Sequence, residues 1–293
     1  MAKVSVTDEL LDAYVNRPLA QHIVNAVKPT RVTPNHLTLV SASLGTLAGA
    51  LLTVDPGVQP YAPFAATFSL FASMVFDCSD GQLARARGGG SVTGRIYDGL
   101  GDYVVAFSLH LGILITLGNR GAVLFGHALD ARERFLLVLI AGASMALNSG
   151  RFDFYKQRYL AHTDNDREPE SPATYLDAAM RSDSFVDRCV LRLFAWYVRM
   201  QQGPAFLRDV AEAKACARDP ERVATFIEGH GPLVRLWSFS GPTMHNALIC
   251  LAAALVPVYP NAFLGYCLFA IVGVNVYCAV LALFQRRIRT TAG

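Results

Sequence analysis

Two short stretches on either side of a glycine-rich connector decide how this chain folds. The first reads Asp77-Cys78-Ser79-Asp80-Gly81-Gln82-Leu83-Ala84-Arg85, and the second is Gly94 followed by Tyr97-Asp98-Gly99-Leu100-Gly101-Asp102. The first stretch ends an apolar segment and the second begins one. Four carboxylates therefore lie where two apolar segments meet, which is an unusual place for charge.

Helical spacing places these acids on two faces. Asp80, Gly81, Ala84 and Arg85 follow Asp77 at three, four, seven and eight residues, and so share its face. Gly94, Asp98 and Asp102 are spaced by four and share another face. The connector, residues 86–93, contains three consecutive glycines, which predicts a tight reversal between two antiparallel helices. The hairpin brings the four carboxylates together at one end.

Four ionised carboxylates at close quarters repel one another, and a single arginine cannot balance them. Each costs several kcal/mol inside a membrane unless it is paired or coordinated. Carboxylate oxygens suit Mg²⁺ or Mn²⁺, and two such ions are the simplest compensation. Because Mg²⁺ commonly shares its ligand shell with substrate phosphates, the pattern favours a phosphorylated ligand. A purely structural role for all four acids is much the weaker interpretation.

The composition indicates a membrane protein. Of 293 residues, 53% are hydrophobic and 17% are charged, against about 25% charged in soluble proteins. The net charge of +3 is too small to suggest nucleic-acid binding. The six cysteines form no Cys-x-x-Cys pair, so we interpret them as small apolar residues rather than metal or disulfide partners.

Six segments are long and apolar enough, or nearly so, to cross about 30 Å of hydrocarbon, which takes roughly 20 residues. They are residues 36–54, 61–80, 96–117, 135–152, 234–256 and 262–284. Before them, residues 1–33 contain an amphipathic segment over 8–28, which we expect to lie on the membrane surface and to be interrupted at Pro18. The predicted fold is an all-α, six-helix, multi-pass membrane bundle that forms a single domain over residues 1–293.

The distribution of lysine and arginine predicts the orientation of this bundle. Ten basic residues flank the spans on the side of the two termini, and three lie on the other side, in the loop around residues 118–134. The termini and the four-acid site are therefore predicted to face the cytoplasm. The long polar stretch over 153–233, between spans four and five, falls on the same side and is predicted to be a helical insertion.

The insertion contains one further amphipathic pattern. An apolar stripe has three arginines, Arg188, Arg192 and Arg199, on another face. Its members are Val186, Cys189, Val190, Leu193, Tyr197 and Met200. Two interpretations fit it equally well: a helix lying on anionic lipid, or a solvated helix packed on the bundle. The acidic run at 163–171 reads as an exposed loop.

The four-acid pattern resembles the signature of the CDP-alcohol phosphotransferase family. Every spacing of Asp-x₂-Asp-Gly-x₂-Ala-Arg-x₈-Gly-x₃-Asp-x₃-Asp is met between Asp77 and Asp102. A six-helix bundle is also what the family implies. The Pro34-Asn35-x-x-Thr38 start of span one resembles a family element near the nucleotide site. The insertion at 153–233 matches no family feature.

The resemblance implies an integral membrane enzyme of phospholipid biosynthesis. In such enzymes a hydroxyl attacks the β-phosphorus of a CDP-linked substrate and CMP leaves. By this analogy, metal ligands would be Asp77, Asp80, Asp98 and Asp102, and Asp102 would also be the general base, with Asp98 beside it. Gly81, Ala84 and Arg85 would contact the CDP moiety, and Gly94 would allow the helices to pack closely. Family members are commonly homodimers.

The substrates are less determined than the chemistry. We expect CDP-diacylglycerol as donor, with a CDP-aminoalcohol as the alternative, and leave the acceptor open among inositol phosphate, glycerol phosphate, serine and others. Arg151, Lys156 and Arg158 lie where a phosphorylated acceptor would want positive charge, but the orientation rule also places basic residues there. The competing class is an ion-coupled transporter whose carboxylates bind ions or relay protons, which gives no reason for the Gly81-x-x-Ala84-Arg85 register.

Overall fold

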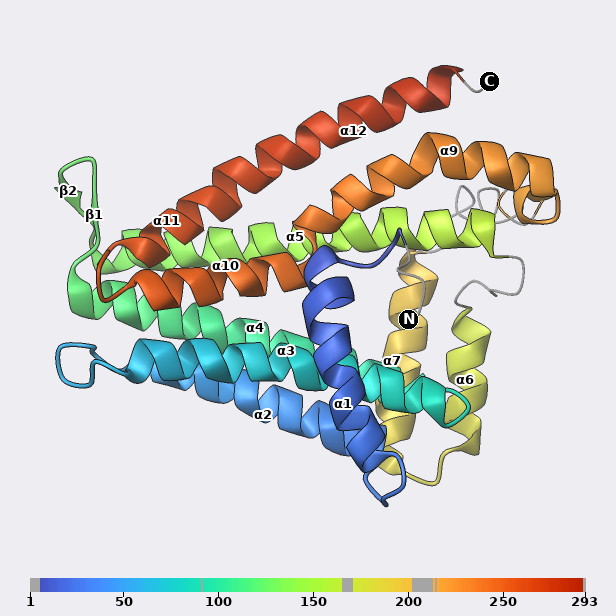
Figure 1. Cartoon of the computed structure of the whole chain (residues 1–293), viewed down its shortest axis with the longest axis horizontal. Coiled ribbons are helices and arrows are strands. Elements are labelled where there is room, and N and C mark those ends of the chain that lie inside the picture. Colours follow the sequence, from blue (N-terminus) through green and yellow to red (C-terminus); the bar gives the residue numbers. More distant parts are fainter. Residues whose placement is uncertain (1–5, 91, 165–170, 202–212, 214, 292–293) are drawn as a thin grey trace.

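The computed structural model describes residues 6–90, 92–164, 171–201, 213 and 215–291, and is almost entirely helical (Figure 1). Long helices run side by side along one axis. They are α2 (Pro34–Leu52), α3 (Ala62–Ala86), α4 (Val92–Arg120), α5 (Ala131–Thr163), α10 (Pro242–Leu255), and α11 (Ala262–Leu268) continued through a π-helical turn (Phe269–Gly273) into α12 (Val274–Thr291). The predicted helical fold class is confirmed. Two two-residue strands, β1 (Val123–Leu124) and β2 (His127–Ala128), pair antiparallel at the far end.

Small residues let α2 and α4 approach closely along their length. A Cβ added at Gly112 would overlap the backbone carbonyl of Gly49, and one added at Gly49 would overlap Ser108. Glycine at these positions allows backbone-to-backbone contact, which is how helices pack where lipid provides no hydrophobic drive. Thr116 adds a hydrogen bond from its Oγ1 to the Leu52 carbonyl, at 2.5 Å. Contacts in the middle of the bundle therefore fix α2 and α4 relative to each other, and the positions of the acids depend on these helices.

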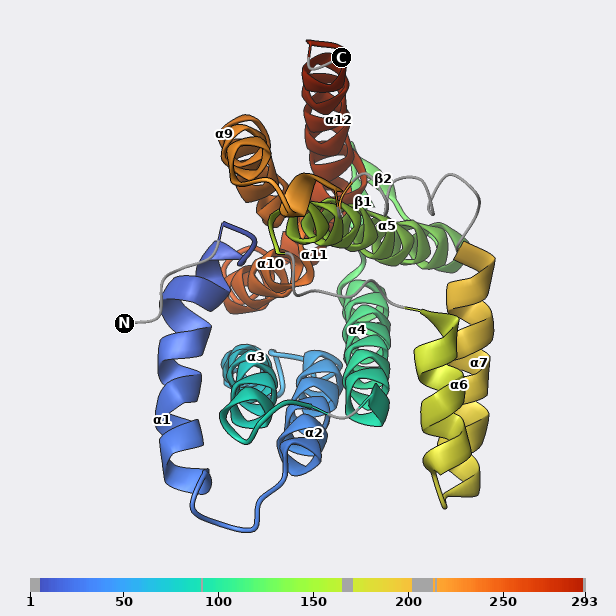
Figure 2. The same ribbon diagram turned by 90° about the vertical axis from the view of Figure 1, so that its right-hand side faces the viewer.

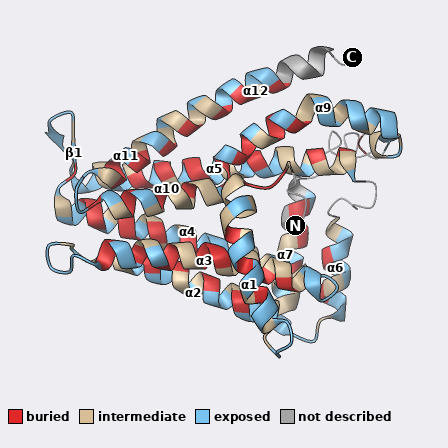
Figure 3. Cartoon of the chain, viewed as in Figure 1, coloured by how far each residue is buried: buried red, intermediate tan, exposed pale blue. Residues whose placement is uncertain are grey.

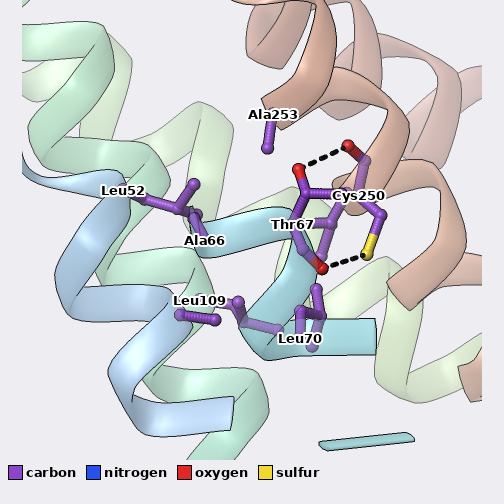
Figure 4. Close-up of a pocket in the computed structure, with 9 residues that line it drawn as sticks. Leu52, Ala66, Thr67, Leu70, Leu109, Cys250 and Ala253 are labelled. Carbon is purple, nitrogen blue, oxygen red and sulfur yellow. Dashed lines mark hydrogen bonds between the residues drawn. The ribbon is translucent and has the colours of Figure 1, made fainter. Parts of the chain in front are cut away.

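The largest buried cluster fills the bundle between α2, α3, α4, α5, α10 and α11 (Figure 3). Helix α10 is tied to α3 inside this cluster by a reciprocal pair of hydrogen bonds (Figure 4). Thr67 Oγ1 donates to the Cys250 carbonyl at 3.2 Å, and Cys250 Sγ donates to the Thr67 carbonyl at 3.7 Å. Cys250 here acts as a small, partly buried residue with a weak donor.

Among the described residues, five helices are long and apolar enough to cross a membrane, and six were predicted. Five such helices are the architecture of an integral membrane protein. Four of the six segments correspond to α2–α5 and the last to residues 262–285. The segment predicted at 234–256 is divided instead: α9 (Pro220–Trp237) ends, a 3₁₀ turn follows at Ser238–Ser240, and α10 begins at Pro242 with only 14 residues. Proline lacks the N–H of a continuing helix and disfavours helical geometry at Gly241, so the break falls there.

Three helices lie across the long axis instead of along it. Helix α1 (Arg17–Val27), α6 (Pro172–Arg181) and α7 (Phe185–Gln201) run vertically in Figure 1 and in the view turned by 90° in Figure 2. In Figure 2, α1 passes on one side of α2, α3 and α4, and the α6–α7 pair passes on the other. The predicted insertion is thus helical in its described parts, where α9 also packs along α5. Part of the acidic run, residues 165–170, lies outside the described residues.

The predicted interruption at Pro18 is wrong. Helical backbone runs from residue 10 through α1, with a π-helical turn at Asp12–Asn16 directly before it. In this turn the Arg17 N–H bonds to the Asp12 carbonyl, and Pro18 takes one of the first two positions of α1. Pro18 has no N–H to donate to the preceding turn, and its ring would crowd the carbonyl four residues earlier in a regular α-helix. The π-helical turn therefore lets the helix continue where the proline suggested a break.

Candidate metal and nucleotide site

The glycine connector forms the reversal that the sequence predicted. Helix α3 ends at Ala86 and α4 begins at Val92, and Gly88 and Gly89 have φ values of 98° and 116°. Positive φ of this kind strains any residue with a Cβ, which explains why glycines occupy the turn. The Gly89 N–H bonds back to the Ala84 carbonyl at 2.9 Å and closes the end of α3. The antiparallel hairpin brings the acidic faces of α3 and α4 together.

Three of the four predicted acids meet in one cluster. Carboxylate oxygens of Asp77, Asp80 and Asp98 lie within 4.8 Å of one another. Asp80 is buried, and the other two are half-buried. One oxygen of Asp98, Oδ1, is buried without a hydrogen-bond partner. An unpaired carboxylate oxygen among two other carboxylates is a costly arrangement that a hard divalent cation would relieve, so these residues fit such an ion.

Asp102 occupies a different position from the other three. It lies one turn further along α4 than Asp98, its side chain is exposed, and it is not part of the cluster within 4.8 Å. It remains near enough to interact electrostatically with Asp98, Asp80 and Asp77. Asp102 therefore lies at the open edge of the site, where a second molecule can reach it.

The residues predicted to contact the nucleotide flank the acids on α3. Arg85 is exposed, and its guanidinium lies back along the helix over Gly81. A Cβ added at Gly81 would be 3.4 Å from Arg85 Nη1. Arg85 also interacts electrostatically with Asp80. Gly81 and Ala84 are half-buried, and Gly94 lies half-buried in the first turn of α4.

Thr38 is joined to the acidic cluster by a direct hydrogen bond. Its Oγ1 donates to Asp80 Oδ2 at 2.5 Å, across 42 residues of sequence. The capping box of Thr33 and His36 fixes the start of α2, and Pro34 takes one of the first two positions of that helix. The Pro34-Asn35-x-x-Thr38 element is thus part of the site, and the hydroxyl orients one carboxylate of the cluster.

Asp12, which belongs to the N-terminal segment, was not predicted as a site residue from the sequence. Cys78 Sγ donates to Asp12 Oδ1 at 3.7 Å, and Thr243 Oγ1 donates to Asp12 Oδ2 at 3.0 Å. Asp12 also interacts electrostatically with Asp77 and Asp102. A fifth carboxylate therefore lies near the site, between α3 and the start of α10.

Glu9, one turn before Asp12, docks the same segment on the start of α10. Its Oε2 accepts a hydrogen bond from the Met244 N–H at 3.2 Å, and a Cβ at Gly241 would overlap its carboxyl. Burial raises the pKa of the Glu9 carboxyl to about 8, and the negative charge of Asp12 raises it too. Most of this carboxyl is therefore protonated at pH 7, so it caps α10 without burying a full charge.

Two residues of the motif that are not acids, Cys78 and Gln82, attach α3 to α1 and to the π-helical turn before it. Besides the Cys78–Asp12 contact, Gln82 Nε2 donates to the Arg17 carbonyl at 3.1 Å. Arg87 binds four carbonyl groups at and beyond the end of α1, with Nη1 to Val32 at 2.5 Å among them. Arg87 thus has a structural role. The count of basic residues used to predict orientation did not distinguish this role from others. One face of α3 carries the acids while another packs on α1.

Comparison with known proteins agrees with this site. Residues 31–162, which include the whole motif, match the model of the CDP-alcohol phosphatidyltransferase family. This part of the chain belongs to that family, as the motif predicted. A phosphatidylinositol phosphate synthase of Corynebacterium glutamicum is 45% identical over 74 residues, which cover 25% of this chain and 32% of the relative. The match thus spans about a third of that relative's length. No solved structure matches the chain.

Proposed function

We propose that this chain transfers the phosphatidyl group of CDP-diacylglycerol to the hydroxyl of an alcohol and releases CMP. The observation that carries the proposal is the cluster of Asp77, Asp80 and Asp98, with Asp102 at its open edge, in a CDP-alcohol phosphatidyltransferase domain. A pyrophosphate is itself anionic, so an acidic site can accept it only when cations lie between the two. We therefore include Mg²⁺ or Mn²⁺, as two ions, in the proposal.

Asp77, Asp80 and Asp98 would hold the metal, with Asp102 completing the ligand set. When bound, such ions neutralise charge on the pyrophosphate and on the CMP leaving group. Thr38 keeps Asp80 in place through its hydrogen bond. Gly81 and Ala84 leave room for the CDP moiety beside α3, and Arg85 is placed to meet its phosphates. Gly94 has no side chain and would allow α3 and α4 to pack closely at the first turn of α4.

Asp102 is the proposed proton acceptor for the attacking hydroxyl. Its exposure at the edge of the site gives an incoming alcohol access to it. A carboxylate that also binds a metal has a lowered proton affinity, so Asp102 mainly orients the hydroxyl and receives its proton late in the transfer. Asp98, one turn away on the same face, belongs to the reacting centre in this proposal.

The proposed topology places the site at the cytoplasmic surface. The side chains of Arg286, Arg287 and Arg289, which contribute to the charge count, lie outside the described side chains. The charge count rests on the sequence and favours cytoplasmic termini. In this topology α10 is the fifth span, shorter than the others, and the 153–233 insertion is cytoplasmic. A homodimer, common in the family, is part of the same proposal.

For the acceptor, the name of the relative places a phosphorylated inositol first. Arg151 is exposed near the cytoplasmic end of α5 in this topology, where a phosphate could approach. It donates to Asn148 Oδ1 at 2.9 Å, and Asn148 is fully buried. The other candidate acceptors are glycerol phosphate and serine.

The test is CMP release by the purified protein reconstituted in lipid. The assay contains CDP-diacylglycerol or a CDP-aminoalcohol, Mg²⁺ or Mn²⁺, and a panel of alcohols. We expect CMP with CDP-diacylglycerol and one acceptor, and loss of that activity in EDTA. An absence of CMP with every donor and acceptor pair, together with ion-coupled solute flux into vesicles, would establish the transporter instead.

A further inference from the structure

Helix α7 has an exposed apolar face, although it packs well through its other side. Leu191, Ala195 and Val198 are buried in a cluster with Tyr175 and Ala179 of α6. The opposite face carries four large apolar side chains with exposed fractions of 59–72%: Phe185, Val186, Leu193 and Trp196. The apolar stripe seen in the sequence is thus mostly exposed, and different residues make the packing contacts. Tyr197 and Met200 lie outside the described side chains.

Arginines border one edge of this face. At 100° per residue, Arg188, Arg192 and Arg199 project beside Phe185 and Trp196. Arg192 and Arg199 are exposed, and Arg188 is half-buried. An apolar face with cations along its edge is the pattern of a helix lying in a membrane interface, where the cations meet lipid phosphates.

The orientation of α7 suits that position. It lies across the long helices in both Figure 1 and Figure 2, and therefore parallel to the plane of a membrane that those helices cross. A helix in this orientation can place its whole length at one depth.

Helix α4 fixes the depth at which the hairpin lies. Val92 and Ile96 of α4 pack against the α6–α7 cluster. The same face of α4 continues with Leu100, Tyr103 and Phe107, whose exposed fractions are 53%, 71% and 72%. The hairpin thus covers α4 directly before Leu100, Tyr103 and Phe107, the exposed apolar residues of a helix long and apolar enough to cross a membrane.

We infer that the exposed face of α7 binds the surface of an anionic phospholipid bilayer. Phe185, Val186, Leu193 and Trp196 enter the boundary between headgroups and acyl chains, while Arg192 and Arg199 bind lipid phosphates. Tyr97 Oη donates to Asp187 Oδ1 at 2.5 Å, so α7 is joined to α4 at the residue before Asp98. The hairpin holds the beginning of the site-bearing helix at the membrane surface. This inference does not depend on the transfer reaction.

Trp196 reports on the contact directly, because the chain has two tryptophans and the other, Trp237, is 1% exposed. The full chain is reconstituted in bilayers of phosphatidylcholine with 0 or about 30% phosphatidylglycerol, with or without lipids brominated on their acyl chains. We expect brominated lipid to quench the emission of Trp196, and iodide in the buffer not to quench it. The Trp196→Phe variant measures the remaining signal of Trp237 and is subtracted.

The arginines are tested by comparing Arg192→Gln with Arg132→Gln, an exposed arginine at the opposite end of the bundle. One arginine near an anionic surface shifts a docking equilibrium about fivefold. We expect Arg192→Gln to reduce the docking equilibrium constant of α7 (the ratio of docked to undocked helix) by that factor in anionic bilayers and not in neutral ones, whereas Arg132→Gln changes neither. Circular dichroism of each variant confirms the fold.

Two results would overturn the inference. Quenching of Trp196 by iodide but not by brominated lipid would show a solvated helix. Protection from both quenchers, with emission that changes on dilution of protein in lipid, would show that a second copy of the chain covers the face. Each outcome is read from fluorescence, so it leaves the proposed reaction unaffected.

Discussion

The two helical hairpins of this protein, α3–α4 and α6–α7, distribute polarity in opposite ways. The first runs along the bundle and turns carboxylates inward, with Asp77, Asp80 and Asp98 within 4.8 Å. The second lies across the bundle and turns large apolar side chains outward. Clustered carboxylates cost free energy when no cation balances them, and exposed apolar side chains cost free energy in water. Each arrangement therefore indicates what it binds. The inward charge fits a cation, and the outward apolar face fits a bilayer.

The hairpins also differ in how they are held. Helix α4 contacts α2 through backbone at Gly49 and Gly112, whereas the α6–α7 hairpin joins α4 through a small apolar cluster and the Tyr97–Asp187 hydrogen bond. The site-bearing hairpin is therefore the rigid part, and the crossing hairpin is the weaker attachment. The following predictions test this difference.

The largest effect is expected from removing charge inside α3–α4. Asp98→Asn keeps the size of the side chain but loses a metal-ligating carboxylate, so we expect CMP release to fall roughly 10²–10³-fold. Membrane insertion should be unchanged, since a buried charge is lost rather than gained. Asp153→Asn, an exposed acid on α5, is the matched control and should keep full activity. Near-normal turnover by Asp98→Asn would refute the site.

A packing variant tests the rigidity of the site-bearing hairpin. A Cβ at Gly112 would overlap the Gly49 carbonyl, so we expect Gly112→Ala to lower the free energy of unfolding by about 1–3 kcal/mol. Gly118 lies in the same helix with nothing within 4 Å of its Cβ position. Gly118→Ala should therefore leave stability unchanged or raise it by up to about 1 kcal/mol. Detergent-induced unfolding measures both, and equal effects would contradict the close contact.

The Thr38 hydroxyl offers a smaller test of the site. Thr38→Val keeps the shape of the side chain and removes the hydrogen bond to Asp80. A hydrogen bond to a charged group contributes about 1.5–3 kcal/mol, so kcat/KM for CMP release should fall about tenfold or more. Thr38→Ser keeps the hydroxyl and should retain most of the activity. If the two variants behave alike, the hydroxyl does not position Asp80.

The smallest effect concerns the attachment between the hairpins. Tyr97→Phe removes only the phenolic hydroxyl that bonds Asp187; because Asp187, unlike Asp80, is only half-buried and water can replace the lost donor, the cost is about 1 kcal/mol. We expect amide hydrogen exchange in α6 and α7 to become about fivefold faster, with α2 and the middle of α4 unaffected. Exchange that stays unchanged in α6 and α7 would show that the apolar cluster alone holds the hairpin.

Local patterns predicted the features that depend on one helix or one turn. The spacing from Asp77 to Asp102 identified the acidic faces, and three consecutive glycines predicted the reversal between them, because both follow from backbone geometry over a few residues. Hydropathy located five of the six predicted segments. At 234–256 the apolar composition suggested one long helix, whereas the structure divides the segment at Gly241-Pro242.

Contacts between distant segments were decided only by the tertiary structure. Thr38 reaches Asp80 across 42 residues and Asp12 reaches Cys78 across 66, and neither pair has a signature in the chain between them. The stripe on α7 shows the same limit: its amphipathicity was evident from spacing, but which face packs and which stays exposed depends on where α4 and α6 lie. Helix geometry is local and therefore readable in sequence, whereas the partner of each face is set by how the helices pack together.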